Sequence, residues 1–280
     1  MITNLAIGSA VAIAEARDER RGSSVYAGRA HTMLERTWYA IKSSSWIIIV
    51  SGFFEPVFYL ASFGFGVGQI VGGVSDGSGN PVSYAAFIAP ALLATSAMNG
   101  AIYDSTWNVF FKMTFGKVYQ AMMSTSLGPL DIALGEISWA LLRGLAYAIG
   151  FMCVVWPLGL IPSITGILAI PAAVLIAFGF ASVGMGVTSY MKNFQQMNWV
   201  NFVMLPMFLF SGTFFPLSVF PQWLQTIVQL FPLWHAVEMI RSLTLGQISW
   251  ALAGHAAYFI VLVVLGLLFT TRRLTELFLR

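Results

Sequence analysis

Residues Gly166 to Tyr190 read GILAIPAAVLIAFGFASVGMGVTSY, a run of 25 residues without a charged side chain. A helix that crosses a bilayer needs about 20 predominantly apolar residues, because no water in the hydrocarbon can satisfy its backbone groups. This run is long enough and apolar enough. It therefore predicts a membrane-spanning helix.

Five further stretches share this character, and the whole chain has a matching composition. It is 58% hydrophobic and only 9% charged, which is typical of a membrane protein. We expect an all-α polytopic membrane domain over residues 29–280, preceded by a cytoplasmic leader over residues 1–28. The six expected spans are Trp46–Gly66, Tyr84–Tyr103, Ile137–Gly159, Gly166–Tyr190, Asn198–Leu217 and Trp250–Thr270.

The basic residues predict the orientation, because Lys and Arg favour the cytoplasmic side of a membrane. With the N-terminus inside, 13 of the 14 basic residues lie in or near inner connections, and only Arg241 lies outside. Both termini are therefore expected in the cytoplasm of a multi-pass plasma (inner) membrane protein. The net charge of +3 reflects this topology, so no nucleic-acid partner is expected.

Residues 29–44, ahead of the first span, have an amphipathic pattern. Met33 and Trp38 belong to an apolar stripe, whereas Arg36 and Lys42 lie off it. The pattern predicts a helix in the cytoplasmic interface. The alternative is a solvated helix in front of a membrane anchor.

The inner connection Asp104–Glu136 is long and unusually apolar. It mixes Phe and Met with Lys112, Lys117 and Gln120, and it leaves room for a short helix within Tyr119–Ser126. Apolar residues in a cytoplasmic loop indicate a protein partner. Packing against the membrane surface is the alternative, since Met and Phe also suit the interface.

The outer region Ser218–Ser249 contains two apolar helical pieces, Gln222–Phe231 and Leu233–Leu245, each too short to span. They predict a re-entrant hairpin in the outer leaflet, between the fifth and sixth spans. A hairpin keeps the number of spans even, as the basic residues require.

Histidine and glutamate side chains in and after this hairpin are candidate ligands for a metal ion. His235 and Glu238 are three residues apart and could share a metal ion with His255. Glu238 also lies three residues before Arg241, a spacing that favours an ion pair on one helical face. We prefer the ion pair, so no metal site is expected.

The sequence lacks catalytic motifs. G-x-x-x-x-G-K-[ST] does not occur, and the one Gly-Lys pair, Gly116-Lys117, is followed by Val118. Ser-His-Asp sets and His-Glu-x-x-His are absent too. We expect no ATPase site and no cofactor on this chain.

Three polar residues are candidates for a path through the membrane. Glu55 precedes Pro56 in the first span, where a carboxylate is a functional hypothesis by default. Glu55 either lines a polar cavity or makes a contact that holds two helices together. Asn198 and Asn201, near the inner end of the fifth span, are polar contacts for a substrate or ordinary helix-end residues.

Three stretches resemble the permease subunits of ABC-2 type exporters, especially the drug-resistance and lipooligosaccharide (nodulation-type) branch. They are YQAM at 119–122 with GPLDIALGE at 128–136, PMFLFSGTFFP at 206–216, and PLWH at 232–235 leading to Glu238 and Arg241. The resemblance covers about Arg29 to Arg273.

The resemblance implies a partner and a mechanism. Residues 117–126 would form a coupling helix on one of a pair of ATPase subunits, which bind ATP and Mg. A second permease chain, identical or a sister, would complete the transporter. Its substrate would be an amphiphilic or hydrophobic drug, glycolipid or lipid-linked saccharide. By this resemblance the coupling residues are Lys117, Tyr119, Gln120, Met122, Met123 and Ser126, and Phe210 and Phe214 join the substrate path or its supporting structure.

Two other classes stay open. An ion-coupled secondary transporter also uses broken helices and buried carboxylates, but inverted repeats and more ionisable groups are expected of it. A membrane scaffold without transport would have the same spans and no need for an apolar cytoplasmic loop.

Overall fold

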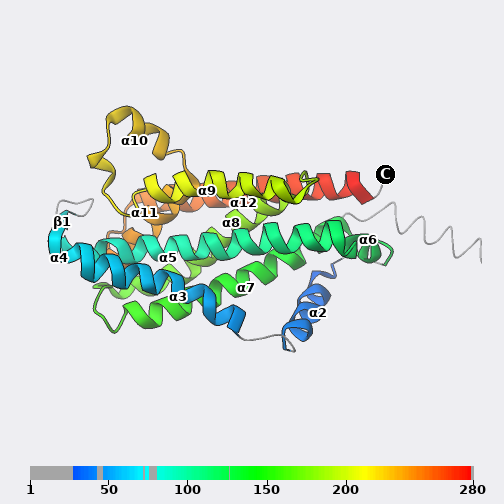
Figure 1. The fold of residues 1–280 in the computed structure, drawn as a ribbon, viewed down its shortest axis with the longest axis horizontal. Coiled ribbons are helices and arrows are strands. Elements are labelled where there is room, and N and C mark those ends of the chain that lie inside the picture. Colours follow the sequence, from blue (N-terminus) through cyan, green and yellow to red (C-terminus); the bar gives the residue numbers. More distant parts are fainter. Residues whose placement is uncertain (1–27, 43–46, 72, 76–80, 126, 279–280) are drawn as a thin grey trace, which may run out of the picture.

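The computed structural model describes residues 28–42, 47–71, 73–75, 81–125 and 127–278. Its long helices run side by side along the long axis of the molecule (Figure 1). Helices α2 and α6 and the end of α12 lie at one end of the bundle, and α4, β1 and α10 lie at the other. The leader and the coupling candidate Ser126 fall outside the described residues.

Within the described part of the chain, five helices are long and apolar enough to cross a membrane. This bears out a mostly helical, polytopic membrane protein. The long helices are α3 (Ile47–Ala61) continued by η1 (Ser62–Val67) and α4 (Gly68–Val71), α5 (Tyr84–Tyr103) continued by η2 (Asp104–Asn108) and η3 (Phe111–Phe115), α7 (Pro129–Val155), η4 (Ile164–Leu168) with α8 (Ala169–Thr188), and α12 (Trp250–Phe278).

Shorter elements connect and flank these helices. Strands β1 and β2 form a small antiparallel pair. The shorter elements are α2 (Ala30–Lys42), β1 (Gly73–Ser75), β2 (Pro81–Ser83), α6 (Val118–Met123), η5 (Phe194–Met197), α9 (Asn198–Phe210), η6 (Leu217–Val219), α10 (Gln222–Val228) and α11 (Pro232–Leu245).

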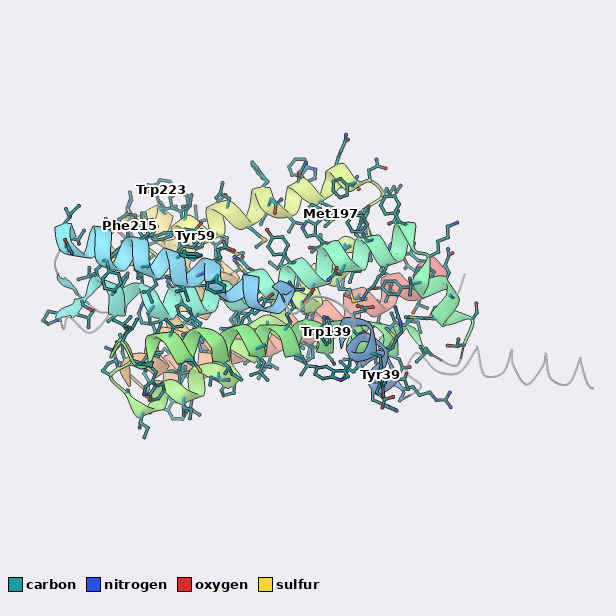
Figure 2. All side chains as sticks on the ribbon, turned by 60° about the horizontal axis from the view of Figure 1, so that its bottom comes forward. Tyr39, Tyr59, Trp139, Met197, Phe215 and Trp223 are labelled. Carbon is teal, nitrogen blue, oxygen red and sulfur yellow. The ribbon has the colours of Figure 1, made fainter. Side chains whose placement is uncertain are left out.

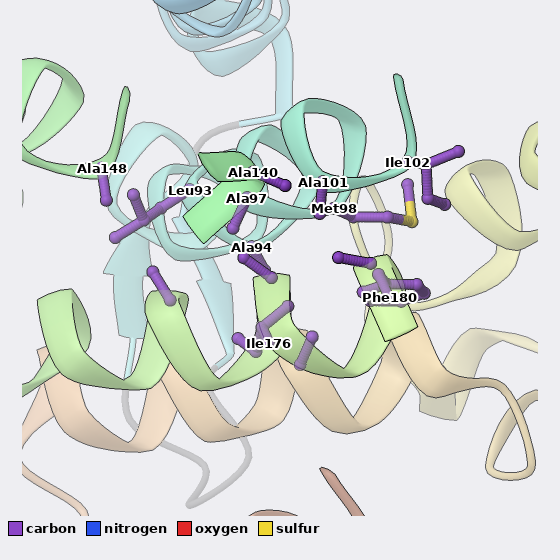
Figure 3. Close-up of a cluster of buried hydrophobic side chains, with 14 of the residues drawn as sticks. Leu93, Ala94, Ala97, Met98, Ala101, Ile102, Ala140, Ala148, Ile176 and Phe180 are labelled. Atoms are coloured by element: carbon purple, nitrogen blue, oxygen red, sulfur yellow. The ribbon is translucent and has the colours of Figure 1, made fainter. Parts of the chain in front are cut away.

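Helix α5 is the centre of the bundle, and most of its residues are buried. Small side chains let its neighbours approach closely. Figure 3 shows Ala94 and Ala97 of α5 close to Ala140 of α7 and Ile176 of α8. All four side chains are buried.

Helix α8 packs against α12 through a face of small residues. A Cβ atom at Gly179 would lie 2.7 Å from the Phe259 ring, and one at Gly186 would lie 2.7 Å from the Phe269 ring. The structure shows that the contact is within one chain.

Two helices extend further than the sequence predicted. The second span was expected to end at Tyr103, but helical backbone continues through π-helical turns to Phe115. The third was expected from Ile137, but α7 starts at Pro129. Proline suits the first turn of a helix, and Asp131 Oδ2 accepts a 3.0 Å hydrogen bond from the Gly128 N–H.

The fifth span stays a prediction. Helix α9 has 13 residues, so at 1.5 Å per residue it is about 20 Å long, shorter than the hydrocarbon of a bilayer. The predicted helical pair after it does form, as α10 and α11. Its re-entrant position in a membrane stays a prediction as well.

Candidate functional site

Helices α3, α5, α7 and α9 line a half-open cavity with a volume of about 570 Å³. Figure 2 marks one of its lining residues, Tyr59, between the ribbons of α3 and α9. The lining residues are Glu55, Pro56, Tyr59, Leu92, Thr95, Ser96, Met98, Asn99, Gly100, Tyr103, Arg143, Tyr147, Asn201, Met204, Leu205 and Phe208.

The lining combines apolar side chains with a few polar ones. Carboxylate, guanidinium and amide groups come from Glu55, Arg143, Asn99 and Asn201. Such a mixture is typical of binding sites for small molecules, in which polar groups orient a largely apolar ligand. Polar groups at membrane depth are expensive, which favours a functional role for them.

An ion pair fixes one wall of this cavity. Arg143 Nη1 donates to Asp104 Oδ1 at 2.7 Å, and Arg143 Nε donates to the Tyr147 hydroxyl at 2.8 Å. Asn108 Nδ2 also donates to Asp104 Oδ1, at 2.6 Å. The guanidinium is therefore held by both α5 and α7. Because Gly100 lacks a side chain, the Tyr147 ring can lie against α5, 3.1 Å from where a Cβ atom would be.

The cavity includes two of the polar residues singled out from the sequence. Glu55 and Asn201 both line it, so the interpretation of Glu55 as a cavity residue agrees with the geometry. Asn198, at the start of α9, is exposed and is absent from the described lining. Gln196 lies in the turn before α9, where its side-chain oxygen accepts a 2.7 Å hydrogen bond from the Lys192 N–H.

The two candidate phenylalanines, Phe210 and Phe214, follow Phe208, which is the last residue of α9 that lines the cavity. Phe214 is buried, with its ring centroid 4.9 Å from Phe63 and 5.1 Å from Phe208. Phe210 is partly exposed and contacts Phe220 at 5.8 Å. Both support the structure around the cavity rather than belonging to its described lining.

Sequence reasoning missed Asp104 and Tyr147. Asp104 was placed in an inner loop, although apolar Trp107, Phe110 and Phe111 continue a helical spacing beyond it. That continued pattern was the available signal. Nothing in the sequence marks Tyr147, which became part of the cavity because α5 and α7 pack together there.

The short helix α6, at the end of the bundle where α12 also ends (Figure 1), presents two different faces. Tyr119, Met122 and Met123 are buried, whereas Lys117 and Gln120 are exposed. Lys117 has φ of 46°, the left-handed backbone that starts the helix abruptly. The predicted coupling residues therefore divide into an inward and an outward set.

The inward face of α6 is tied to its neighbours. Burial, followed by the adjacent Glu136 carboxylate, raises the pKa of the Tyr119 hydroxyl well above its ordinary value. Glu136 itself pairs with Lys112 at 2.5 Å. Arg36 Nη1 lies 3.8 Å from the Met122 sulfur, so α2 also contacts α6.

Helix α2 docks on α7 by its apolar stripe. Met33 is buried against Gly135, where a side chain would overlap Met33. The Arg29 N–H donates to Asp131 Oδ1 at 2.8 Å. Trp38 is exposed, and Lys42 is the last residue of α2.

At the other end of the molecule, the predicted pair between Glu238 and Arg241 forms, with an N···O distance of 2.6 Å. Arg241 Nη2 also donates to the Gly212 carbonyl at 2.8 Å, and its guanidinium lies 4.2 Å from the centre of the Phe87 ring. This arginine therefore joins α11 to α5 and to the segment after α9.

His235 and His255 connect α11 to α12. Their Nδ1 atoms lie 2.8 Å apart, within hydrogen-bond distance. Burial, followed by the neighbouring His255, lowers the pKa of His235. Among the described residues, no group of three or more His, Cys, Asp or Glu side chains is placed to hold a metal ion.

Comparison of the sequence with known proteins gives the family of this helical bundle. The chain belongs to the ABC-2 type transporter family, whose family model matches residues 29–245. It is a permease-type, multi-pass protein of the inner membrane.

Curated relatives match most of the chain. Nodulation protein J of Rhizobium leguminosarum bv. viciae is 31% identical over 246 residues, which cover 88% of this chain and 93% of that protein. Nodulation protein J of Sinorhizobium fredii is 32% identical over 231 residues, covering 82% of this chain and 86% of that protein. The family supports a membrane subunit without an ATPase site of its own.

Proposed function

We propose that this chain is the permease subunit of an ATP-driven exporter that moves an amphiphilic or hydrophobic molecule out of the cytoplasm or the inner leaflet. The observation that carries the proposal is the cavity between α3, α5, α7 and α9 in a member of the ABC-2 family. Its polar groups suit a headgroup, and Leu92, Met204 and Phe208 suit an acyl or ring system.

The substrate class is an amphiphilic drug, a glycolipid or a lipid-linked saccharide. The side-chain amides of Asn99 and Asn201 can donate to and accept from hydroxyl groups, and the Glu55 carboxylate can accept from them. The Tyr103 and Tyr147 rings offer flat apolar faces beside them.

The proposed topology has six spans with both termini in the cytoplasm. Helix α9 and its flanking turns form the fifth span, and α10 with α11 form the outer re-entrant hairpin. The basic residues support this orientation, because Arg36, Lys112 and Lys117 belong to elements at the end of the bundle where α12 also ends (Figure 1).

We place the ATPase-binding surface on the outward face of α6. Lys117 and Gln120 are exposed there and can contact a pair of ATPase subunits, which carry ATP and Mg. The buried Tyr119, Met122 and Met123 would hold α6 to the bundle, so that a push on the outward face reaches α7. Exposed Trp38 on α2 extends the same surface.

A second permease chain, identical or a sister, completes the proposed transporter. Helix α9 offers a continuous exposed apolar side for that chain and for lipid. Its exposed apolar residues are Trp199, Phe202, Val203, Leu205, Leu209 and Phe210.

The proposal is tested by filling the cavity. Asn201→Phe adds a ring inside the cavity, whereas Asn198→Phe places the same ring on the same helix outside the described lining. Inverted membrane vesicles are loaded from outside with a fluorescent lipid analogue, with and without ATP. We expect ATP-dependent uptake by the wild type and by Asn198→Phe, and loss of uptake in Asn201→Phe.

Two results would contradict the proposal. The first is uptake by Asn201→Phe that equals the wild type. The second is uptake that follows an imposed proton gradient and ignores ATP, which would favour a secondary transporter.

A further inference from the structure

An aromatic cluster joins two cytoplasmic-side segments that are far apart in the sequence. Trp107, Phe110, Phe111 and Phe115 come from the π-helical continuation of α5, and Phe194 comes from η5. The Phe194 ring centroid lies 5.3 Å from Trp107 and 5.9 Å from Phe111. Edge-to-face and tilted contacts at these distances are favourable.

The α5 side of this cluster is connected tightly to α6. Phe115 ends η3, and only Gly116 and Lys117 separate it from α6. The Gly116 N–H donates to the Phe111 carbonyl at 2.9 Å, and the Ala121 N–H donates to the Lys117 carbonyl at 3.3 Å. A displacement of α6 is therefore carried directly to the cluster.

The other side of the cluster is connected tightly to α9. Phe194 is the first residue of η5, and α9 begins directly after η5. The Gln196 side chain caps this turn by accepting from the Lys192 N–H at 2.7 Å, which fixes the turn's shape. Phe194 and the inner end of α9 therefore move together.

Helix α9 itself packs loosely between its two ends, where Val200 and Met204 are only partly buried against the core. The structure describes all of its 13 residues, and Met207 alone among them is buried. At its outer end, the Phe208 ring contacts Tyr59 at 6.0 Å and Phe214 at 5.1 Å. At its inner end, Phe194 provides the aromatic contact.

We propose that Phe194 is a positioning residue that transmits displacement of α6 to α9 and so changes the width of the cavity. This inference rests on the proposed function, because an ATPase subunit supplies the displacement. Its structural basis is that α9 carries Asn201, Met204 and Phe208 of the cavity wall. A wall attached at its ends can swing without breaking a packed helix interface.

The experiment measures the movement of α9 in the complex with the ATPase subunit. Cys153→Ser removes the chain's single cysteine. Spin labels on cysteines replacing the exposed Trp199 of α9 and Leu142 of α7 then report the distance between the helices. Distances are compared without nucleotide and after trapping with ATP and vanadate.

In the wild type we expect the distance between the two spin labels to change when nucleotide is trapped. In Phe194→Ala we expect no change of that distance, although this variant should still bind the ATPase subunit and the complex should still trap nucleotide. Phe194→Tyr keeps a ring and is expected to restore the change. Phe202→Ala is the matched control, because it removes an exposed α9 ring whose described ring contact is Trp199, 5.8 Å away.

A normal change of distance in Phe194→Ala would overturn the inference, as would an equal loss in Phe202→Ala. A wild-type complex that traps nucleotide without moving α9 would overturn it too, and would leave the proposed function standing. A wild-type chain that binds no ATPase subunit would contradict the proposed function itself, and this is seen at purification.

Discussion

Arg143 of α7 donates a 2.7 Å hydrogen bond to Asp104, which lies in the π-helical continuation of α5. The pair joins two long helices, and its Arg143 lines the cavity. Asp104 is almost completely buried, with a side-chain exposure of 2%. A carboxylate in such a place depends on its partner, since charge removed from water is costly when unpaired.

Arg143→Ala is therefore expected to destabilise the protein. Removing one member of a buried ion pair costs about 3–5 kcal/mol, because it leaves the other charge unpaired. Thermal unfolding in detergent measures the loss. The double variant Asp104→Leu with Arg143→Met removes both charges and should recover most of the stability, whereas a single variant as stable as the wild type would refute the role of the pair.

Gly135→Ala should detach α2 from α7. A Cβ atom at Gly135 would overlap the Met33 side chain, so the interface helix must shift. Limited proteolysis around α2 should become several-fold faster. Gly254→Ala is the control, since no atom lies within 4 Å of its Cβ position and alanine is about 1 kcal/mol better than glycine in a helix.

Tyr119→Ala should destabilise the end of the bundle that carries α6. The ring is fully buried, and deleting a large buried aromatic ring costs about 3–5 kcal/mol. Gln120→Ala, on the exposed face of the same helix, is expected to stay within about 0.5 kcal/mol of the wild type. Equal unfolding temperatures for the two variants would contradict the division of α6 into two faces.

His235 should make stability dependent on pH. Its pKa is lowered in the folded state from the ordinary 6.5, first by burial and then by His255. Below pH 6.5 the His235 side chain therefore binds a proton more readily in the unfolded chain than in the folded chain. The folded state is then less favoured, so stability falls as the pH falls.

The measurement compares unfolding temperatures at about pH 7.5 and about pH 5.5. The wild type should lose stability on acidification, and His235→Gln should lose less. His31→Gln, which changes an exposed histidine of α2, should behave like the wild type. If the unfolding temperature of His235→Gln depends on pH as strongly as that of the wild type, groups other than His235 cause the pH dependence.

The long apolar helices could be predicted from the sequence because hydrocarbon thickness imposes a length and a composition that Gly166–Tyr190 displays plainly. Pro221 directly precedes α10, and Pro232 is the first residue of α11, so prolines mark where the helical pair begins. Helix ends were harder to predict, since Asp104 looks like the start of a loop until the ion pair with Arg143 is known.

The site was only half predictable for a similar reason. Glu55 and Asn201 stand out because they are polar residues among apolar ones, whereas Tyr147 and Gly100 matter only through the contact between α5 and α7. The two faces of α6 were missed because a helix of 6 residues has too short a pattern to show which side is buried.

The most direct test of the account is to purify the tagged chain from its own membranes in mild detergent and identify what elutes with it. The account predicts a stoichiometric ATPase subunit, retained by Tyr119→Phe and lost when Lys117→Glu is combined with Gln120→Glu. A chain that elutes alone, and that moves solute down an ion gradient in liposomes, would contradict it.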